Sequence, residues 1–172
     1  AAVIGVCKEF LKTKLVALGV PEAQIRTTLD KGGRYEIPNS AIILVSEDTW
    51  ERTSGTAADK FKGTDPRSYT IFRNRYTRKL VLELSLIGKN EAWVDGKVEA
   101  LAQMERSIVQ HDAALDEDIR IDAGFKRIEW DDIGALLPGV YAAQVYVEFS
   151  RPYLARNNAP YYTDVELTAE LE

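Results

Sequence analysis

A long run of alternating apolar and polar side chains, Tyr69 to Ile87, constrains the fold of this chain more than any other feature. Side chains alternate between the two faces of a strand, so this pattern predicts β-structure. The apolar face carries Phe72, Tyr76, Leu80, Leu82, Leu84 and Leu86, and the polar face carries Arg73, Arg75, Lys79, Glu83 and Ser85. The run is several times longer than an ordinary strand. It therefore predicts either two strands with a bend near Tyr76-Thr77 or one strand that continues as an arm beyond the domain.

An amphipathic helical pattern follows the alternating run directly. Asn90 comes just after Gly88 and Lys89, where it can cap a helix. Apolar residues then recur at helical spacing: Trp93, Val94, Val98, Leu101, Met104, Ile108 and Val109. Asp95-Gly96 would also suit a tight hairpin, but the sustained spacing favours a helix over Asn90–His111.

The remaining apolar patterns predict a second helix and further strands. A stripe from Val3 to Leu18 is typical of an amphipathic helix that stops at Gly19. The continuous apolar run Ala41–Val45 is typical of a central strand, expected over residues 40–46. Three more strands are expected over Ile119–Asp131, Tyr141–Ser150 and Asp164–Glu170. Few helices separate the strands, so we expect an α+β fold, with a mostly antiparallel sheet and the two main helices packed on one side.

The length of 172 residues fits a single domain over residues 1–172. Residues 46–70 are polar and punctuated by glycine and proline, which predicts a long loop or an extended arm. Residues 153–172 follow the strand expected up to Ser150, and we interpret them as a C-terminal extension.

Composition excludes several classes of protein. Cys7 is the only cysteine, which rules out a disulfide framework and a cysteine-based zinc site. The net charge of −5 argues against non-specific nucleic-acid binding by the whole molecule. No apolar run approaches the roughly 20 residues of a membrane span, and the chain shows no signal-peptide pattern. We expect a soluble protein that is made inside a cell and has no membrane partner.

The sequence shows no pattern typical of catalysis. His111 is the only histidine and no Gly-x-Ser-x-Gly motif accompanies it, so we favour a surface residue at a helix end over a general base. Acidic residues gather at Asp112, Asp116, Glu117, Asp118 and Asp122. Arg120 interrupts the calcium-loop pattern, which favours a solvated turn. Phosphate-binding glycine motifs are missing as well. We predict no enzyme activity, no cofactor and no metal.

A basic cluster is the strongest remaining signal. It consists of Lys60, Lys62, Arg67, Arg73, Arg75, Arg78 and Lys79, with Tyr69, Phe72 and Tyr76 interleaved. We favour an interface with an acidic surface of a neighbouring copy or partner. A plain solvated strand face comes second. Nucleic-acid binding comes last, because alternation places the rings on the face away from Arg73 and Arg75.

This organisation resembles the tail terminator proteins of tailed bacteriophages, also called tail completion or head–tail joining proteins, and those of related contractile injection systems. The similarity spans roughly residues 3–155. It consists of the N-terminal helix, Arg34-Tyr35-Glu36-Ile37-Pro38 leading into Ala41–Val45, a polar arm, the strand Leu80–Leu86, the helix Asn90–His111, and the strand Val140–Phe149 followed by Arg151.

The resemblance implies a subunit that closes into a ring, typically a hexamer, on the last ring of the tail tube. Such a ring ends tube growth and meets the head–tail connector protein. Implied partners are other copies of the chain, the tail tube protein and the connector, with DNA only passing through the lumen. The implied location is the tail–neck junction of the virion, after assembly in the host cytoplasm. Alternatives are another neck or minor tail ring component, or a nucleic-acid-binding α+β module that uses residues 60–79.

Overall fold

The computed structural model describes residues 2–28, 39–53, 58–65, 68–104, 106–131 and 140–160. The helices are α1 (Val3–Ala17) and α2 (Glu91–Ala102), and a short 3-10 helix spans Glu22–Gln24. The strands are β1 (Ile25–Arg26), β2 (Ser40–Arg52), β3 (Ala58–Asp65), β4 (Ser68–Gly88), β5 (Ser107–Asp112), β6 (Glu117–Asp131) and β7 (Tyr141–Pro160).

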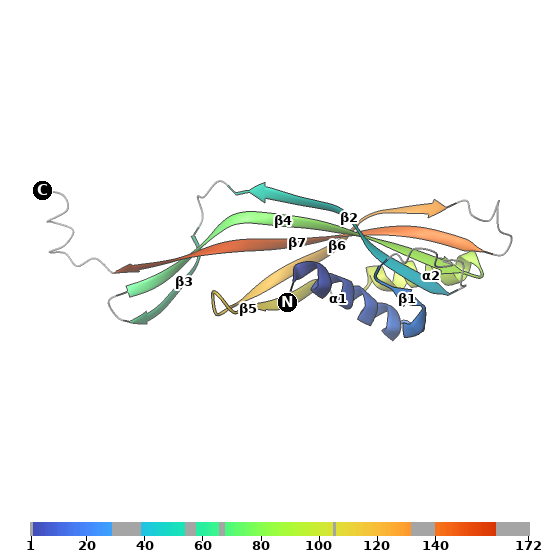
Figure 1. The fold of residues 1–172 in the computed structure, drawn as a ribbon, viewed down its shortest axis with the longest axis horizontal. Helices are drawn as coiled ribbons and strands as arrows, with labels where there is room; N and C mark the ends of the chain where they lie inside the picture. Colours follow the sequence, from blue (N-terminus) through green and yellow to red (C-terminus); the bar gives the residue numbers. More distant parts are fainter. Residues whose placement is uncertain are drawn as a thin grey trace, which may run out of the picture.

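One twisted sheet dominates the fold (Figure 1). Its strand order is β1-β2-β4-β7-β6-β5, and β3 pairs with the far end of β4. Among the described strands, β1 and β2 pair in parallel and the other neighbours are antiparallel. The predicted α+β class and the predominance of antiparallel pairing agree with this arrangement.

Strands β4 and β7 form the long axis of the sheet. They have 21 and 20 residues and pair from Ser68 opposite Pro160 to Gly88 opposite Tyr141. Of the two arrangements that the alternating pattern allowed, the chain adopts a single strand. A bulge shifts the register between Asn74 and Tyr76, next to the point where a bend was predicted.

The hydrophobic core lies between one face of this sheet and the two helices. Every fourth residue or so of α1 is buried, and α2 buries a similar stripe. These side chains meet the alternate residues of β4 and β7 that face them. The main contributors are Val3, Cys7, Leu11, Leu15, Leu80, Leu82, Leu84, Leu86, Val94, Val98, Leu101, Ala143, Val145, Val147 and Phe149. The ring of Phe10 on α1 packs edge-on against Phe149, with the centroids 6.1 Å apart.

Local signals set the ends of both helices. Helix α1 ends before Gly19, whose φ of 94° suits a residue without a Cβ. Helix α2 begins after Asn90, whose side-chain oxygen accepts a hydrogen bond from the Trp93 amide at 2.7 Å. At Gly88 an added Cβ would lie 2.6 Å from the Trp93 ring, so glycine permits the close approach of α2 to β4.

The predicted helix over Asn90–His111 was too long. Helix α2 ends at Ala102, and Ser107–Asp112 forms strand β5, which pairs with β6. Ile108 packs against the core, whereas its neighbour Val109 is 66% exposed. This alternation between adjacent residues is that of a strand. β-branched residues at 108 and 109 favour a strand, and the apparent helical spacing across Gln103–Ser107 was coincidental.

The polar segment 46–70 was expected to be a loop or an arm. Its described residues are mostly strand: β2 continues to Arg52, β3 covers residues 58–65 and β4 begins at Ser68. The predicted strand ending at Ser150 continues to Pro160, so part of the C-terminal extension belongs to β7. The strand expected over residues 164–170, and the Arg34–Pro38 segment, lie outside the described residues.

Candidate functional site: the arginine junction

The long sheet has two parts that differ in what covers them. Both helices lie against the part that contains residues 80–88 of β4 (Figure 1). Strand β3 and the far ends of β4 and β7 project away from the helices. We call β3 together with residues 68–79 of β4 and 150–160 of β7 the distal sheet. Where the two parts meet, a polar cluster lies on the helix-bearing face; we call it the arginine junction: Asp48, Trp50, Arg78, Arg151 and Tyr153.

Arg78 is the central residue of the junction. It is in phase with Leu80, Leu82, Leu84 and Leu86, so alternation directs its side chain to the core face, where it is only 12% exposed. Its guanidinium binds both carboxylate oxygens of Asp48, with Nε to Oδ1 at 2.8 Å and Nη2 to Oδ2 at 2.7 Å. The same group lies over the Trp50 ring, 4.8 Å from its centroid.

This paired geometry fixes the charges of both partners. The hydrogen bond to Asp48 raises the pKa of Arg78 above its ordinary value, more strongly than partial burial lowers it. The hydrogen bond from Arg78 holds the pKa of Asp48 below its ordinary value. Bidentate, charge-assisted pairs of this kind are among the stronger polar contacts in proteins. The junction is therefore a fixed ion pair under physiological conditions.

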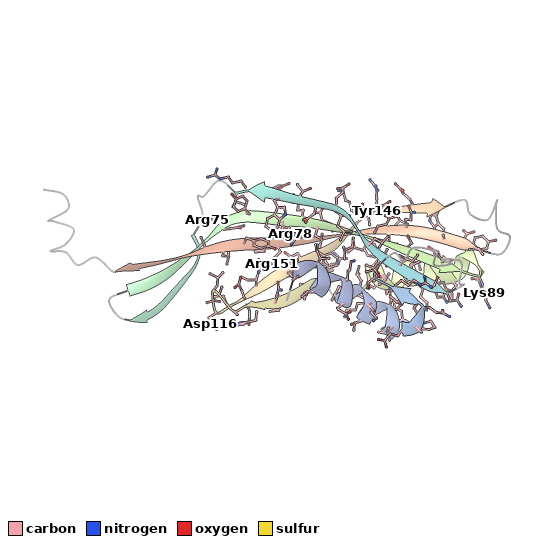
Figure 2. All side chains as sticks on the ribbon, viewed as in Figure 1. Arg75, Arg78, Lys89, Asp116, Tyr146 and Arg151 are labelled. Atoms are coloured by element: carbon pink, nitrogen blue, oxygen red, sulfur yellow. The ribbon has the colours of Figure 1, made fainter. Side chains whose placement is uncertain are left out.

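Arg151 lies directly opposite Arg78, on β7. It is 6% exposed and is held by the β5–β6 hairpin: its Nε donates to Gln110 Oε1 at 3.2 Å, and its Nη2 lies 3.4 Å from Asp112 Oδ2. Two buried cations side by side are tolerated because each has its own carboxylate. Figure 2 shows both arginines near the middle of the sheet.

Tyr153 connects the two arginines. Its ring lies under the Arg151 guanidinium at 4.2 Å, and its hydroxyl accepts a hydrogen bond from Arg78 Nη1 at 3.3 Å. Its ring also packs against Trp50, with the centroids 4.6 Å apart. The junction thus ties together β2, the β4–β7 pair and the β5–β6 hairpin. Its groups neutralise one another, so the arrangement suits holding the distal sheet at a fixed orientation rather than transforming a substrate.

The predicted basic interface residues do not form one surface in the described part of the chain. Arg75 is exposed, whereas Arg78 faces the core side and is bound to Asp48. Lys79 points the other way, with its Nζ 3.2 Å from Glu51 Oε2. The side chains of Lys60, Lys62 and Arg73, and all of Arg67, lie outside the described residues, so their predicted role stays a prediction.

Sequence reasoning missed most of the junction. Sequence patterns place Arg78 in the basic cluster and indicate no role for Trp50 or Tyr153. The alternation of side chains along each strand could have indicated it. Arg78 is on the same strand face as Leu80, Leu82, Leu84 and Leu86, and Arg151 is on the same face as Val147 and Phe149. A cation in phase with a buried apolar row indicates a paired, partly buried charge.

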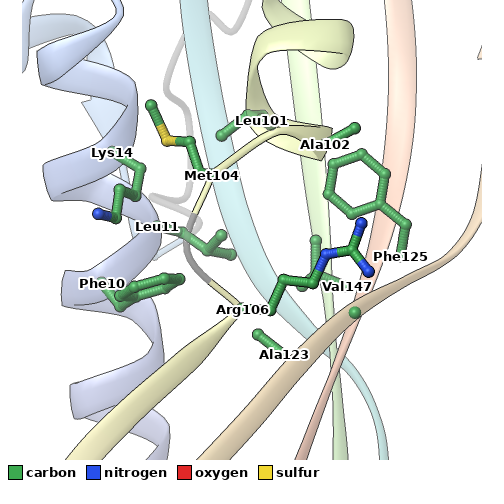
Figure 3. A pocket seen from close by; sticks show the side chains of 11 residues that line it. Phe10, Leu11, Lys14, Leu101, Ala102, Met104, Arg106, Ala123, Phe125 and Val147 are labelled. Atoms are coloured by element: carbon green, nitrogen blue, oxygen red, sulfur yellow. The ribbon is translucent and has the colours of Figure 1, made fainter.

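A pocket of about 330 Å³ opens beside the core, between α1, the end of α2 and β6 (Figure 3). Its lining is mainly apolar and includes Phe10, Met104 and Phe125; Lys14 and Arg106 also line it, and Figure 3 shows the Arg106 side chain extending toward Phe125. Lys14 Nζ lies 5.3 Å from the centroid of the Phe10 ring. The lining contains no acid, histidine or cysteine, so the pocket offers contact area and positive charge but no nucleophile.

His111 lies in β5 and not at a helix end, and it is close to the turn between β5 and β6 together with the acidic cluster except Asp122, which pairs with Ser107 at the other end of the hairpin. Asp112 Oδ1 accepts hydrogen bonds from the amides of Ala114 and Leu115, at 3.0 and 3.3 Å. His111 is exposed, and its Nδ1 lies 3.0 Å from Asp118 Oδ1. Within the described ranges, no three acidic, histidine or cysteine side chains are grouped so that they could hold a metal ion. These carboxylates shape the hairpin.

No known family model matches the sequence, and no curated protein does so either. In the part of the chain that the structure describes, neither helix has the length and apolar character needed to cross a membrane. The long paired strands, the arginine junction and the uncovered sheet therefore carry what can be inferred about function.

Proposed function

We propose that the chain is a structural subunit of a homo-oligomeric ring that caps a bacteriophage tail tube, ends its polymerisation and joins the tail to the head connector. One observation carries this proposal: β4 and β7, with 21 and 20 residues, extend far past the helices as the distal sheet. Strands in globular domains usually have about 5–6 residues. A paired extension of this length serves a contact outside the domain better than it serves a core.

The distal sheet has the properties expected of an assembly arm. A two-stranded hairpin alone is marginally stable in water, but here β3 adds a third strand and the arginine junction anchors the base. An arm that reaches from one subunit to a different patch on the next makes a heterologous contact, which closes into a ring when the rotation allows it. Of the loop or arm expected over residues 46–70, the distal sheet contains residues 58–65 and 68–70.

Charge supports an interface rather than a nucleic-acid platform. Arg78 and Lys79 are already paired with Asp48 and Glu51, which removes two of the cations from a phosphate-binding surface. Exposed Arg75 remains available to an acidic patch of a neighbour, which the net charge of −5 readily supplies. The similarity to tail terminators adds the expected partners: about six copies of the chain, the tail tube protein and the connector.

Native mass spectrometry across a dilution series tests the proposal, with the protein alone and with tail tube protein. We expect one discrete mass near six copies, or a monomer that becomes this ring only on the tube. A strict monomer that ignores the tube and binds RNA or single-stranded DNA in a salt-sensitive way would contradict the proposal and support the nucleic-acid alternative.

Charge reversal locates the interface. The double substitution Arg73→Glu and Arg75→Glu should weaken ring formation at least tenfold and leave the circular dichroism spectrum unchanged. Lys89→Glu is the matched control, because Lys89 is exposed at the opposite end of the sheet (Figure 2). Equal assembly by both variants would remove the distal sheet from the interface.

A further inference from the structure

Strands β2 and β6 each run past the shorter outer strand that pairs with their first residues, which leaves part of one edge of each without a neighbouring strand among the described residues. Strand β1 covers only Ala41 and Ile42 of β2, so residues 45–52 of β2 pair with β4 alone. Strand β6 pairs with β5 up to Asp122, and from there to Asp131 it pairs with β7 alone. Side chains on both faces are exposed along residues 45–52 and 124–130. The Ala123 amide still donates to the Arg106 carbonyl, so we call the unpaired segments the β2 edge (residues 45–52) and the β6 edge (residues 124–131).

Both edges expose large apolar side chains on the helix-bearing face. On the β2 edge these are Val45 and Trp50; on the β6 edge they are Phe125, Ile128 and Trp130. Together they make five of the nine exposed large apolar side chains in the described ranges. Natural sheets usually protect such edges with charges, bulges or cover, because a bare apolar edge recruits another strand. The concentration of apolar groups on both edges therefore indicates a partner strand.

The opposite face of the two edges carries complementary charge. The β2 edge carries Glu47 and Glu51, of which Glu51 also contacts Lys79, and the β6 edge carries Lys126 and Arg127 together with Glu129. The attraction is visible within one chain, where Lys126 Nζ lies 3.2 Å from Glu47 Oε2. Arg127 is held over the Tyr146 ring at 4.2 Å and is also paired with Glu129. Pairing a β2 edge with another β2 edge would place acid against acid. Each edge therefore fits the other better than it fits itself.

The directions of β2 and β6, and the positions of the two edges along the sheet, also suit a contact between the β2 edge of one copy and the β6 edge of another. Within the sheet β2 runs antiparallel to β6, so copies placed side by side in the same orientation would meet as an antiparallel pair. Through the registers, the β2 edge lies level with residues 76–82 of β4, whereas the β6 edge lies level with residues 81–87. Joined copies would thus be staggered along the strands, and such a stagger is required when a sheet closes on itself.

We propose that the β2 edge of one copy pairs with the β6 edge of the next, so that the sheets of successive copies join into one closed belt. This inference rests on the proposed ring and adds a second contact between neighbouring copies, beside that of the distal sheet. The occupant of each edge is a second copy of this chain, because the two edges match in apolar face, charge and strand direction.

Cross-linking between two single-cysteine variants tests this pairing. Thr49→Cys places a thiol on the β2 edge and Glu129→Cys places one on the β6 edge, both on the face away from the helices. Cys7 does not compete, because it is fully buried and burial raises its pKa to about 12. The variants are mixed at ring-forming concentration and treated with a short bismaleimide, which tolerates a small error in register.

We expect covalent dimers in the mixture and none from either variant alone. Val16→Cys on α1, mixed with Thr49→Cys, is the control for random collision, because Val16 is 41% exposed and lies off both edges. Cross-linking of one variant with itself would overturn the head-to-tail pairing. A ring in native mass spectrometry without cross-links would overturn this contact but keep the proposed ring. A monomer throughout would overturn both.

A second pair of variants tests the apolar face of the same edge. Ile128→Lys should raise the ring dissociation constant at least tenfold, because it places a charge where apolar groups would meet. Val16→Lys makes the same chemical change on α1 and should leave the dissociation constant within about twofold. Equal dissociation constants for the two variants would overturn the β6 edge as a contact.

Discussion

The two halves of the β4–β7 pair share one backbone arrangement but differ in what stabilises them. In the helix-covered half, Leu80, Leu82, Leu84 and Leu86 are fully buried against α1 and α2. Toward the distal sheet Tyr76 is 43% exposed and Arg75 is exposed, and the neighbouring cover is the polar arginine junction. Burying one leucine contributes about 1.5–3 kcal/mol, whereas an exposed side chain contributes little. The comparison shows that continuous strand pairing can span regions with very different energetic support.

The difference also separates two tasks. The covered half makes the domain stable and fixes one end of each long strand. The distal half is then free to carry exposed and polar residues, because its orientation is set by the junction and its pairing continues from the core. An extension built this way needs no core of its own, which suits a surface that is completed by another molecule.

Truncation of one large side chain in each half gives the largest contrast. Leu84→Ala, in the covered half, should lower the free energy of unfolding by about 2–5 kcal/mol, because it leaves a cavity among residues that are fully buried. Tyr76→Ala, at the start of the distal half, should change it by less than about 1 kcal/mol. Urea denaturation of both variants checks the comparison, and similar losses would show that the distal half is covered as well.

Removal of the Arg78 side-chain charge tests the link between the halves. Arg78→Met keeps much of the apolar stem but leaves Asp48 without its bidentate partner. The free energy of unfolding should therefore fall by about 1–3 kcal/mol. Amides of β7 beyond Arg151 should also exchange hydrogen faster than in the wild type. Arg75→Met is the matched control, because Arg75 is exposed. Unchanged exchange in Arg78→Met would mean that pairing alone holds the distal sheet.

Features encoded by neighbouring residues were predicted well. The stripe of α1, the stop at Gly19, the Asn90 cap and the strand over Tyr69–Ile87 all follow from local spacing, and the structure places them within a residue or two. Each depends on contacts between residues close in sequence or on a strict period. Such signals survive without knowledge of the rest of the fold.

Features that depend on distant partners were not predicted. The segment after Gln103 has both a helical and an alternating interpretation, and only its pairing with β6 decides for strand β5. The junction brings together residues from β2, β4 and β7, so no local pattern shows that Arg78 and Arg151 are opposite each other. The unpaired edges of β2 and β6 could not be predicted either, because the sequence of a strand does not indicate which strands lie beside it.

The helix cap tests whether the covered half can be weakened alone. Asn90→Ala removes the side-chain acceptor of the Trp93 amide and should lower the free energy of unfolding by about 0.5–2 kcal/mol. Lys89→Ala, at the exposed preceding position, should have little effect. Hydrogen exchange should rise in α2 but not in β7 beyond Arg151. A rise in both regions would show that the two halves are more tightly coupled than their contacts indicate.

The Asp48 carboxylate gives the smallest and most specific effect. The hydrogen bond from Arg78 lowers its pKa in the folded state, while in the unfolded chain it should have the ordinary value of about 3.9. A lowered pKa means that the folded state binds this proton less readily than the unfolded state. The resulting stability is fully present above about pH 4 and is lost as the pH falls through the lower folded value.

Asp48→Asn should therefore unfold more easily than the wild type at pH 7, and the difference should shrink below about pH 4. The effect should be smaller than that of Arg78→Met, because an amide oxygen can still accept one hydrogen bond. Urea denaturation at pH values from 7 to 2.5 measures the difference. In the Arg78→Met background the same substitution should lose its pH dependence, since the group that lowers the pKa is gone. A pH-dependent difference that persists there would assign the acid sensitivity to another partner of Asp48 and would detach it from the junction.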